Sequence, residues 1–318
     1  MDSLRLAIVV PCFNEQEILP DSAGKLAGVL ADMVARGIVA PGSFILFVND
    51  GSTDNTWNII SSLHRDNPVF KGLSLSKNAG HQNALLAGMY FAVREPLDAD
   101  AVITIDADLQ DSLECIPRMV EYCLHGAEIV YGVRSDRQSD SFFKRLTAES
   151  FYKFQQSIGI HTVFNHADFR LMTRRAVLEL EKYTERNFYL RGIVPMLGLR
   201  SEIVEGERSK RIAGHTKYNF SKMMSLAFDG ITSFSVRPMY MIMAIGGIFI
   251  LVAIAIAIYV LVSLLSGTAV HGWSSLMLSI WLVGGMLMLS VGLVGLYVGK
   301  VFIETKHRPR YHIDTLLS

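Results

Sequence analysis

The sequence is poor in cysteine and has no net charge. Its three cysteines, Cys12, Cys115 and Cys123, have neither disulfide nor zinc-site spacing, so reduced thiols are expected. Lys plus Arg and Asp plus Glu each number 30 among 318 residues, which leaves no global basic signal for nucleic-acid binding. These absences exclude a disulfide or zinc framework and predict no nucleic-acid partner.

The two common glycine-rich phosphate loops are also absent. Neither Gly-x-Gly-x-x-Gly nor Gly-x-x-x-x-Gly-Lys occurs in the chain. The phosphates of a bound nucleotide would therefore lack a glycine cradle. A divalent metal ion that bridges the phosphates is the expected substitute.

Charged residues are missing from two long apolar stretches in the last third of the chain. Residues 240–265 and 276–298 contain no Lys, Arg, Asp or Glu. Each exceeds the roughly 20 residues that cross a bilayer core, and neither has a polar face beyond scattered serines. They predict two transmembrane helices within 239–300 rather than a pair of helices buried in a soluble bundle.

The residues around these stretches predict an orientation. The loop between them, 266–275, has no Lys or Arg, whereas the outer ends carry Arg237, Lys300, Lys306, Arg308 and Arg310. The positive-inside rule then places residues 1–237 and both termini in the cytoplasm. No signal peptide is expected, since the apolar run 6–10 is too short. We therefore predict a multi-pass protein of the inner (cytoplasmic) membrane.

Upstream of the membrane stretches, short apolar runs alternate with helical patterns. Strands are expected at 6–10, 44–48, 72–75, 101–105 and 129–133, with helices between them. This alternation predicts an α/β fold with a mostly parallel, doubly wound sheet. Ligands of such sheets bind outside the carboxyl ends of the strands, so polar residues at those ends are candidates for a site.

An acidic turn follows the strand at 101–105. It brings Asp106, Asp108 and Gln110 together with a third carboxylate, that of Asp111. A cluster of ligands that are all oxygen atoms suits Mg²⁺ or Mn²⁺. Because Asp-x-Asp alone is a weak signal, a solvated acidic turn is the alternative. We predict a metal site at Asp106, Asp108 and Gln110.

Polar residues also follow the first two strands. Asn14 and Glu15 come after the first strand, and Asp50 comes after the second. The base and ribose of a nucleotide are expected over Pro11 and Asp50, with the diphosphate reaching the metal at Asp106. The alternatives are that Asp50 only forms a turn and that Asn14 and Glu15 only begin a helix.

Several motifs, in the order in which they occur, resemble one enzyme family. They are Val-Pro-Cys-Phe-Asn-Glu at 10–15, Val-Asn-Asp-Gly-Ser-Thr-Asp at 48–54, Asp-Ala-Asp-Leu-Gln-Asp at 106–111 and the paired apolar stretches. With these motifs the chain resembles the polyprenyl-phosphate glycosyltransferases of family 2, which include dolichol-phosphate mannose synthase and, nearer in pattern, the bactoprenol glucosyltransferases. The bactoprenol branch also shares the segments 168–172, 185–187, 211–214, 216–217, 230–235 and 303–306.

The resemblance implies an A-type glycosyltransferase fold and an inverting, metal-dependent reaction. One sugar, glucose from UDP-glucose, would pass from the nucleoside diphosphate to undecaprenyl or another polyprenyl phosphate at the cytoplasmic face of the lipid bilayer. The cofactor would be Mg²⁺ or Mn²⁺. A flippase would then move the lipid-linked monosaccharide on for lipopolysaccharide or cell-wall glycan modification, and tetrameric relatives suggest a homo-oligomer.

The same resemblance divides the chain into four parts. Residues 1–208 would form the cytoplasmic glycosyltransferase domain, and 209–238 would form a basic loop with an amphipathic juxtamembrane segment. Residues 239–300 would form the two transmembrane helices. Residues 301–318 would then be a cytoplasmic C-terminal tail.

Basic residues outside the strands are the expected phosphate ligands. The basic, aromatic stretch that includes Arg134 and Arg145 indicates an amphipathic helix at the membrane surface or, alternatively, a helix packed on the sheet. The resemblance implies that these two arginines bind the acceptor phosphate. It also implies that Arg211 and Lys217 belong to a segment that closes over the donor diphosphate, unless they are only a positive-inside flank.

Asp168 and Arg170 lie on an expected edge strand at 167–172, where their spacing allows an ion pair. In the resembled family this aspartate lies close to the reaction centre. A lipid monophosphate, with a second pKa of about 6, needs orientation more than it needs a base. Asp168 is therefore expected to contact sugar hydroxyls or to position other groups, with a structural role as the alternative. The candidate catalytic residues are therefore Asp108, Arg134 and Asp168.

Competing functions fit the sequence less well. A processive polysaccharide synthase needs a Gln-x-x-Arg-Trp signature, and none of Trp57, Trp273 and Trp281 follows an arginine. A channel or transporter subunit is disfavoured, since neither apolar stretch carries an ionisable residue. A non-catalytic sugar-nucleotide-binding scaffold stays open, as do GDP-mannose, UDP-N-acetylglucosamine and modified sugars as donors. His81 is isolated in the sequence and is expected to be a packing or surface residue.

Overall fold

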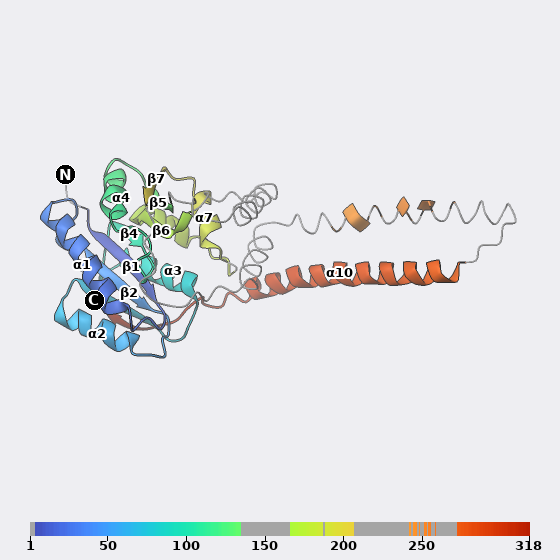
Figure 1. The fold of residues 1–318 in the computed structure, drawn as a ribbon, viewed down its shortest axis with the longest axis horizontal. Coiled ribbons are helices and arrows are strands. Elements are labelled where there is room, and N and C mark those ends of the chain that lie inside the picture. The colour runs from blue at the N-terminus through green and yellow to red at the C-terminus, as the bar shows by residue number, and fades with distance from the viewer. Residues whose placement is uncertain are drawn as a thin grey trace. The chain divides into compact units, whose positions relative to one another are not determined.

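The computed structural model describes residues 4–134, 166–186, 188–206 and 272–318, with scattered positions between 242 and 258. These residues fall into two compact units. The first contains the described residues up to 206 together with 308–318, and the second contains the long helix α10 (Trp273–Thr305) (Figure 1).

The first unit is built on an eight-stranded sheet with the order β7-β5-β6-β4-β1-β2-β3-β8. The central strands β4, β1, β2 and β3 are parallel, and β5 is parallel to β7. The strand β6 is antiparallel to both β4 and β5, and β8 is antiparallel to β3. The α/β fold with a mostly parallel sheet is confirmed. The strands are β1 (Leu6–Cys12), β2 (Phe44–Asn49), β3 (Phe70–Leu75), β4 (Ala101–Thr104), β5 (Ile129–Arg134), β6 (His166–Thr173), β7 (Ser201–Gly206) and β8 (Ile313–Leu317).

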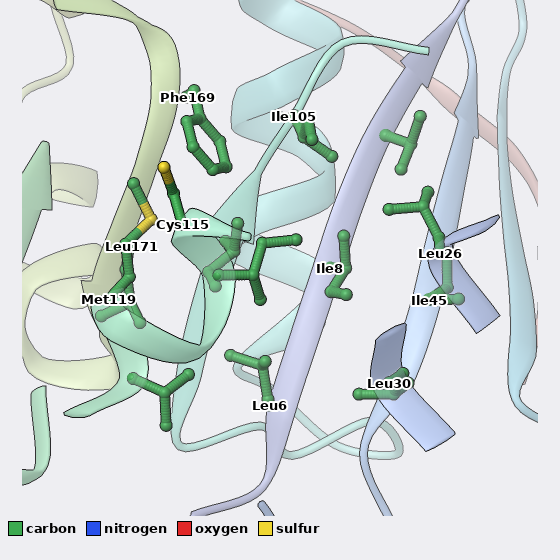
Figure 2. Close-up of a cluster of buried hydrophobic side chains, with 14 of the residues drawn as sticks. Leu6, Ile8, Leu26, Leu30, Ile45, Ile105, Cys115, Met119, Phe169 and Leu171 are labelled. Atoms are coloured by element: carbon green, nitrogen blue, oxygen red, sulfur yellow. The ribbon is translucent and has the colours of Figure 1, made fainter. Parts of the chain in front are cut away.

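Helices bury both faces of this sheet. One face meets α1, where Leu26 and Leu30 point towards Ile8 and Ile45 (Figure 2). The other face meets α3, whose Gly88 approaches the side chains of two strand valines so closely that a Cβ there would overlap them. Burial on both faces explains why the strands are nearly continuous apolar runs. The helices are α1 (Leu19–Ala35), α2 (Thr56–Asp66), α3 (His81–Ala92), α4 (Cys115–Leu124), α6 (Arg174–Glu181) and α7 (Leu190–Met196).

The prediction that residues 167–172 form an edge strand was wrong. The strand β6 lies inside the sheet, paired through Leu171 with both Ile103 and Val130. Because Asp168 and Arg170 pair with each other, the strand can be buried on both sides.

The segment expected to be only a cytoplasmic tail contributes a strand to the sheet. Residues Ile313–Leu317 form β8 along β3, and the Ser76 N–H donates a 2.9 Å hydrogen bond to the His312 carbonyl. Leu317 packs over Gly72, where an added Cβ would lie 3.0 Å from the leucine side chain. The sequence analysis did not predict this strand.

The second unit contains one candidate membrane span among the described residues. Within α10, the candidate span Leu282–Thr305 is 24 residues long and contains an 18-residue window with a mean hydropathy of 2.0. It overlaps the predicted span 276–298. The other predicted span, 240–265, falls mostly outside the described residues, so the pair of transmembrane helices stays a prediction.

Candidate active site

The site lies at the carboxyl ends of the central parallel strands. Asp50 follows β2, the acidic turn follows β4, and His81 begins α3 just after β3. Asp168 reaches the same region from β6, which runs antiparallel to β4, so that Thr104 pairs with Arg170. The Thr104 hydroxyl donates a short hydrogen bond to the Asp168 carbonyl. One edge of the sheet therefore collects the polar residues, as the sequence predicted.

The loops after β1 and β2 are tied together at this edge. Asn14 has a positive φ of 56°, its N–H donates to the Ser52 hydroxyl at 3.0 Å, and its side-chain oxygen accepts from the Thr53 N–H at 2.8 Å. The Glu15 N–H donates to the Thr56 hydroxyl at 3.0 Å. Asn14 and Glu15 thus shape the loop beside Pro11 at the end of β1. Their predicted contact with a nucleoside remains a prediction.

Asp50 is buried and accepts backbone hydrogen bonds from the N–H groups of Ala79, at 2.7 Å, and Gly80, at 3.0 Å. Burial raises the pKa of this carboxyl group, although the two N–H donors and His81 oppose the rise. The aspartate therefore fixes the loop that leads into α3. That contact explains its position without excluding a role in nucleoside binding.

We expect Gly51→Ala to destabilise the first unit by about 2 kcal/mol or more. Gly51 has φ +63°, and a Cβ there would overlap the backbone of Lys77 and Asn78. The clash would push this backbone away from Asp50. Thermal unfolding of the purified protein measures the effect, with Gly37→Ala as control.

Gly37 has a similar φ of +69°, yet a Cβ there would meet nothing within 4 Å. Gly37→Ala should lower the stability only by the cost of an alanine in the left-handed backbone conformation, about 1 kcal/mol. Equal losses of stability in Gly51→Ala and Gly37→Ala would show that the backbone overlap at Gly51 adds nothing to the destabilisation.

The acidic turn after β4 has the character of a metal site. The Gln110 amide nitrogen donates to Asp108 Oδ2 at 2.6 Å, which orients that carboxylate. Asp106 Oδ1 is buried and has no hydrogen-bond partner among the described residues. Desolvation raises the pKa of Asp106, and the neighbouring carboxylates of Asp168, Asp111 and Asp108 raise it further.

These observations fit a divalent cation. The described residues contain no group of three or more His, Cys, Asp or Glu side chains placed to hold a metal by themselves. Mg²⁺, however, usually takes one or two protein carboxylates and completes its shell with water and substrate phosphates. Asp106 and Asp108 supply two such carboxylates, and a cation would relieve the repulsion around Asp106. Gln110 is better placed to orient Asp108, and its direct ligation stays a prediction.

Asp168 is the centre of a network of cationic side chains. Arg170 Nη2 lies 2.8 Å from Asp168 Oδ1, and Arg191 approaches both carboxylate oxygens, with Nε at 3.2 Å from Oδ1 and Nη2 at 3.0 Å from Oδ2. His81 Nε2 is 3.4 Å from Asp168 Oδ2 and 3.6 Å from Asp106 Oδ1. The predicted ion pair of Asp168 with Arg170 is confirmed.

The pKa of Asp168 reflects this network. Burial alone would raise the pKa, but the contacts with His81, Arg170 and Arg191 outweigh burial and hold it well below the ordinary value. Burial likewise opposes the protonation of His81, while Asp168 and Asp106 raise the histidine pKa overall. The carboxylate of Asp168 is therefore ionised at neutral pH and already engaged, which makes it a weak base.

His81 is exposed, in line with its interpretation as a packing or surface residue, but it is not isolated, since it contacts Asp106 and Asp168. Arg191 was not singled out from the sequence. His81 had a usable signal, since it follows a strand end and opens a helix, and such positions face the ligand edge of the sheet. Arg191 had no comparable signal, because α7 follows no strand directly. Only the structure shows that both residues meet Asp168.

The predicted phosphate ligands cannot be placed. Arg145, Arg211 and Lys217 lie outside the described residues. Arg134 is the last residue of β5, but its side chain also lies outside the described part of the chain. Their roles at the acceptor phosphate and the donor diphosphate stay predictions.

Comparison with known proteins gives consistent matches. Residues 7–180 match the family model described as Glycosyl transferase family 2. The chain is 46% identical over 309 residues to an uncharacterized glycosyltransferase, YkoT, of Bacillus subtilis, covering 97% of this chain and 91% of the relative. It is 39% identical to a prophage bactoprenol glucosyl transferase homolog of Escherichia coli, and 38% identical to the bactoprenol glucosyl transferase of Shigella phage SfV, each over 98% of both chains.

Solved structures share the general fold at lower similarity. The mannosyltransferase PcManGT from Pyrobaculum calidifontis, in complex with GDP-Man and Mn²⁺, is 14% identical with a TM-score of 0.45, covering 94% of this chain and 85% of that chain. Glucosyl-3-phosphoglycerate synthase from Mycobacterium tuberculosis is 16% identical with a TM-score of 0.41, covering 70% of this chain and 76% of that chain.

Proposed function

The chain belongs to glycosyl transferase family 2 and has an A-type α/β fold, and from this premise we propose that it transfers one sugar from a nucleoside diphosphate to a polyprenyl phosphate. Relatives whose names include bactoprenol glucosyl transferase, at 37% to 39% identity over 98% of this chain, support the acceptor class. The same names favour glucose as the sugar and bactoprenol phosphate, which is undecaprenyl phosphate, as the acceptor, and we propose UDP-glucose as the donor. The acidic turn after β4, at the same sheet edge as Asp50, is the structural observation that carries the proposal.

A divalent ion, Mg²⁺ or Mn²⁺, held by Asp106 and Asp108 would neutralise the charge that develops on the leaving diphosphate. Gln110 holds Asp108 in place through its 2.6 Å hydrogen bond. The tied loops that carry Asn14 and Asp50 would hold the nucleoside. Arg211 and Lys217 would then cover the diphosphate.

Asp168 orients groups rather than removing a proton. Its depressed pKa makes it a weak base, and two arginines already occupy both of its oxygens. The acceptor phosphate, with a second pKa of about 6, is largely ionised at neutral pH and needs alignment for attack on the anomeric carbon. Arg134 and Arg145 would supply that alignment, and attack from the face opposite the diphosphate inverts the configuration.

The sheet itself supports a two-span topology. The strand β8, which follows α10, pairs with β3, so the chain returns to the unit from which it departed. A chain that leaves one side of a bilayer and returns to it crosses an even number of times. If α10 spans the membrane, a second crossing lies between residues 206 and 272, where the uncharged stretch 240–265 is long enough.

The exposure of α10 fits a lipid environment. Met288 is 78% exposed and Leu289 71% exposed, and the apolar window of the helix has no buried share. A core helix of a water-soluble domain would be covered by neighbours. With the basic flanks, these features support a cytoplasmic location for the sheet, the C-terminal segment and the reaction. The lipid-linked product would then need a flippase to cross the membrane.

The test is a transfer assay with the purified full-length protein in liposomes that contain undecaprenyl phosphate. Labelled UDP-glucose, UDP-galactose, UDP-N-acetylglucosamine and GDP-mannose are offered in parallel with Mg²⁺ or Mn²⁺. We expect lipid-extractable label from UDP-glucose, abolished by EDTA and restored by added metal.

Label from another donor only would keep the reaction and replace the sugar. Transfer that is indifferent to EDTA would contradict the metal site at Asp106 and Asp108. Nucleotide binding without lipid-linked label from any donor would favour the non-catalytic scaffold. Glucose transferred repeatedly to give a polymer would contradict transfer of a single sugar.

A further inference from the structure

The residues that follow α10 contact the loop that precedes α7. The Arg310 Nη2 atom donates to the carbonyls of Tyr183, at 2.6 Å, and Glu185, at 2.8 Å. Its guanidinium carbon also lies 4.4 Å from the centre of the Phe188 ring, in cation–π contact. Hydrogen bonds from a charged donor are stronger than neutral ones, and the planar guanidinium fits two carbonyls and a ring together. Arg310 therefore holds the loop at several points.

The contact between the two segments is reciprocal. Arg186 Nη1 donates to the Arg308 carbonyl at 3.0 Å, so each segment supplies an arginine to the backbone of the other. The segment around Arg310 is itself fixed by β8, where the His312 carbonyl accepts from Ser76. The loop 183–188 is therefore fastened to the sheet through residues that lie more than 120 positions later in the sequence.

The fastened loop leads directly to the Asp168 network. The Leu190 N–H, at the start of α7, donates to the Gln82 side chain at 2.8 Å. The next residue, Arg191, approaches both oxygens of Asp168. Two contacts therefore fix the position of Arg191. Gln82 holds the first residue of α7, and Arg310 holds the loop that precedes α7.

We propose that Arg310 is a positioning residue of the active site, which sets where Arg191 meets Asp168 by holding the loop 183–188. The inference rests on the proposed function, since the activity it tunes is the sugar transfer. It assigns the segment after the membrane helix a part in the reaction. Arg310 contacts the backbone of the loop and the Phe188 ring, and it acts on the site through Arg191.

The test compares Arg310→Ala with the full-length wild type in the liposome assay. We expect kcat to fall at least about tenfold, because small displacements of positioning groups cost up to about 10²-fold. The KM for the nucleotide sugar should stay within about twofold, since the loops that carry Asn14 and Asp50 do not touch Arg310. Arg310→Lys should give an intermediate kcat, because an ammonium keeps the charge but loses the planar fork.

Lys182→Ala is the matched control. It removes one positive charge beside the same loop, from an exposed side chain that pairs with Glu179. Its kcat should equal that of the wild type. Hydrogen exchange of the full-length protein should become faster across 188–196 in Arg310→Ala and stay unchanged in Lys182→Ala.

Two results would overturn the proposal. The first is a wild-type kcat in Arg310→Ala. The second is a kcat loss that matches the unfolded fraction while the exchange at 188–196 stays unchanged, which would make Arg310 a stability residue only. If Arg310→Ala fails to fold, Arg310→Lys becomes the deciding variant, and a wild-type kcat in Arg310→Lys would refute the inference. If the wild type transfers no sugar, the proposed function fails, whereas the exchange comparison still decides whether Arg310 holds α7.

Discussion

Asp108→Ala should remove nearly all sugar transfer, with kcat lowered by about 10³-fold or more. Loss of a preorganised group that stabilises transition-state charge costs about 10² to 10³ in kcat, and loss of a metal ligand also weakens the ion itself. Asp108 is only partly buried, so the fold and membrane insertion should survive its removal. The liposome assay measures turnover, and binding of Mn²⁺ in the presence of UDP measures the site directly.

Glu114→Ala provides the control for this variant. Glu114 lies just beyond the acidic turn, is exposed, and makes no side-chain cap to α4. It removes the same charge from the same region and should leave kcat and Mn²⁺ binding unchanged. An Asp108→Ala protein that keeps a wild-type kcat would refute the metal assignment. Equal losses of kcat in Asp108→Ala and Glu114→Ala would show that the effect of Asp108→Ala is only the loss of a negative charge in this region.

Asp168→Asn should destabilise the first unit by about 3 kcal/mol, in addition to impairing transfer. Arg170 is fully buried, and Asp168 is its charged partner at 2.8 Å. Two nitrogens of the Arg170 guanidinium, Nε and Nη1, already lack hydrogen-bond partners among the described residues. Removing one partner of a buried pair leaves an uncompensated charge and costs about 3 to 5 kcal/mol. Thermal unfolding in detergent measures the loss.

The double variant Asp168→Asn with Arg170→Met is the control for this stability loss. It removes the buried cation as well, and replacement of a buried ion pair by apolar groups is often close to neutral for stability. Here only the arginine becomes apolar, since the asparagine at position 168 stays polar, so we expect the double variant to recover the part of the loss that comes from the uncompensated charge of Arg170, while transfer stays impaired. A double variant as unstable as Asp168→Asn would show that the loss does not come from the uncompensated charge of Arg170.

The stability difference between wild type and Asp168→Asn should also depend on pH. Because the folded-state pKa of Asp168 is depressed, its contribution is fully present above the unfolded value of about 3.9. The contribution is lost as the pH falls through the lower folded-state pKa. The difference should therefore shrink as the pH falls into the acid range. It should also decrease as the pH rises through the raised pKa of His81, because Asp168 helps to raise that pKa. A difference that grew as the pH fell below about 3.9 would contradict the depressed pKa of Asp168.

The parallel core was predictable because its signals are local. Apolar runs such as 6–10 and 44–48 are buried on both faces, and the polar residues behind them meet at one edge by the geometry of parallel strands. The acidic turn and Asp50 were found in this way. The hydrogen bond from Gln110 to Asp108 is local, since it spans two positions, whereas the one from Ala79 to Asp50 spans 29 positions.

What the sequence did not reveal depends on contacts between distant segments. The interior place of β6 requires that Arg170 be buried against Asp168, which a charged pattern on one strand does not suggest. The contacts of His81 require the start of α3, the turn after β4 and the strand β6 to come together. The strand β8 is a five-residue segment with a charged and a polar residue among three apolar ones, and only its pairing with β3 distinguishes it from a tail.

That pairing also has a consequence for how the protein is made. Ser76 and His312 are 236 positions apart, so a ribosome that adds about 5 to 20 residues per second leaves the outer edge of β3 without its partner for roughly 10 to 50 s. An unpaired edge is a template for association with another nascent chain. Closure of the sheet has to wait until α10 has been synthesised. If α10 spans the membrane, as we propose, completion of the sheet would report that the chain has returned to the side of the bilayer from which it departed.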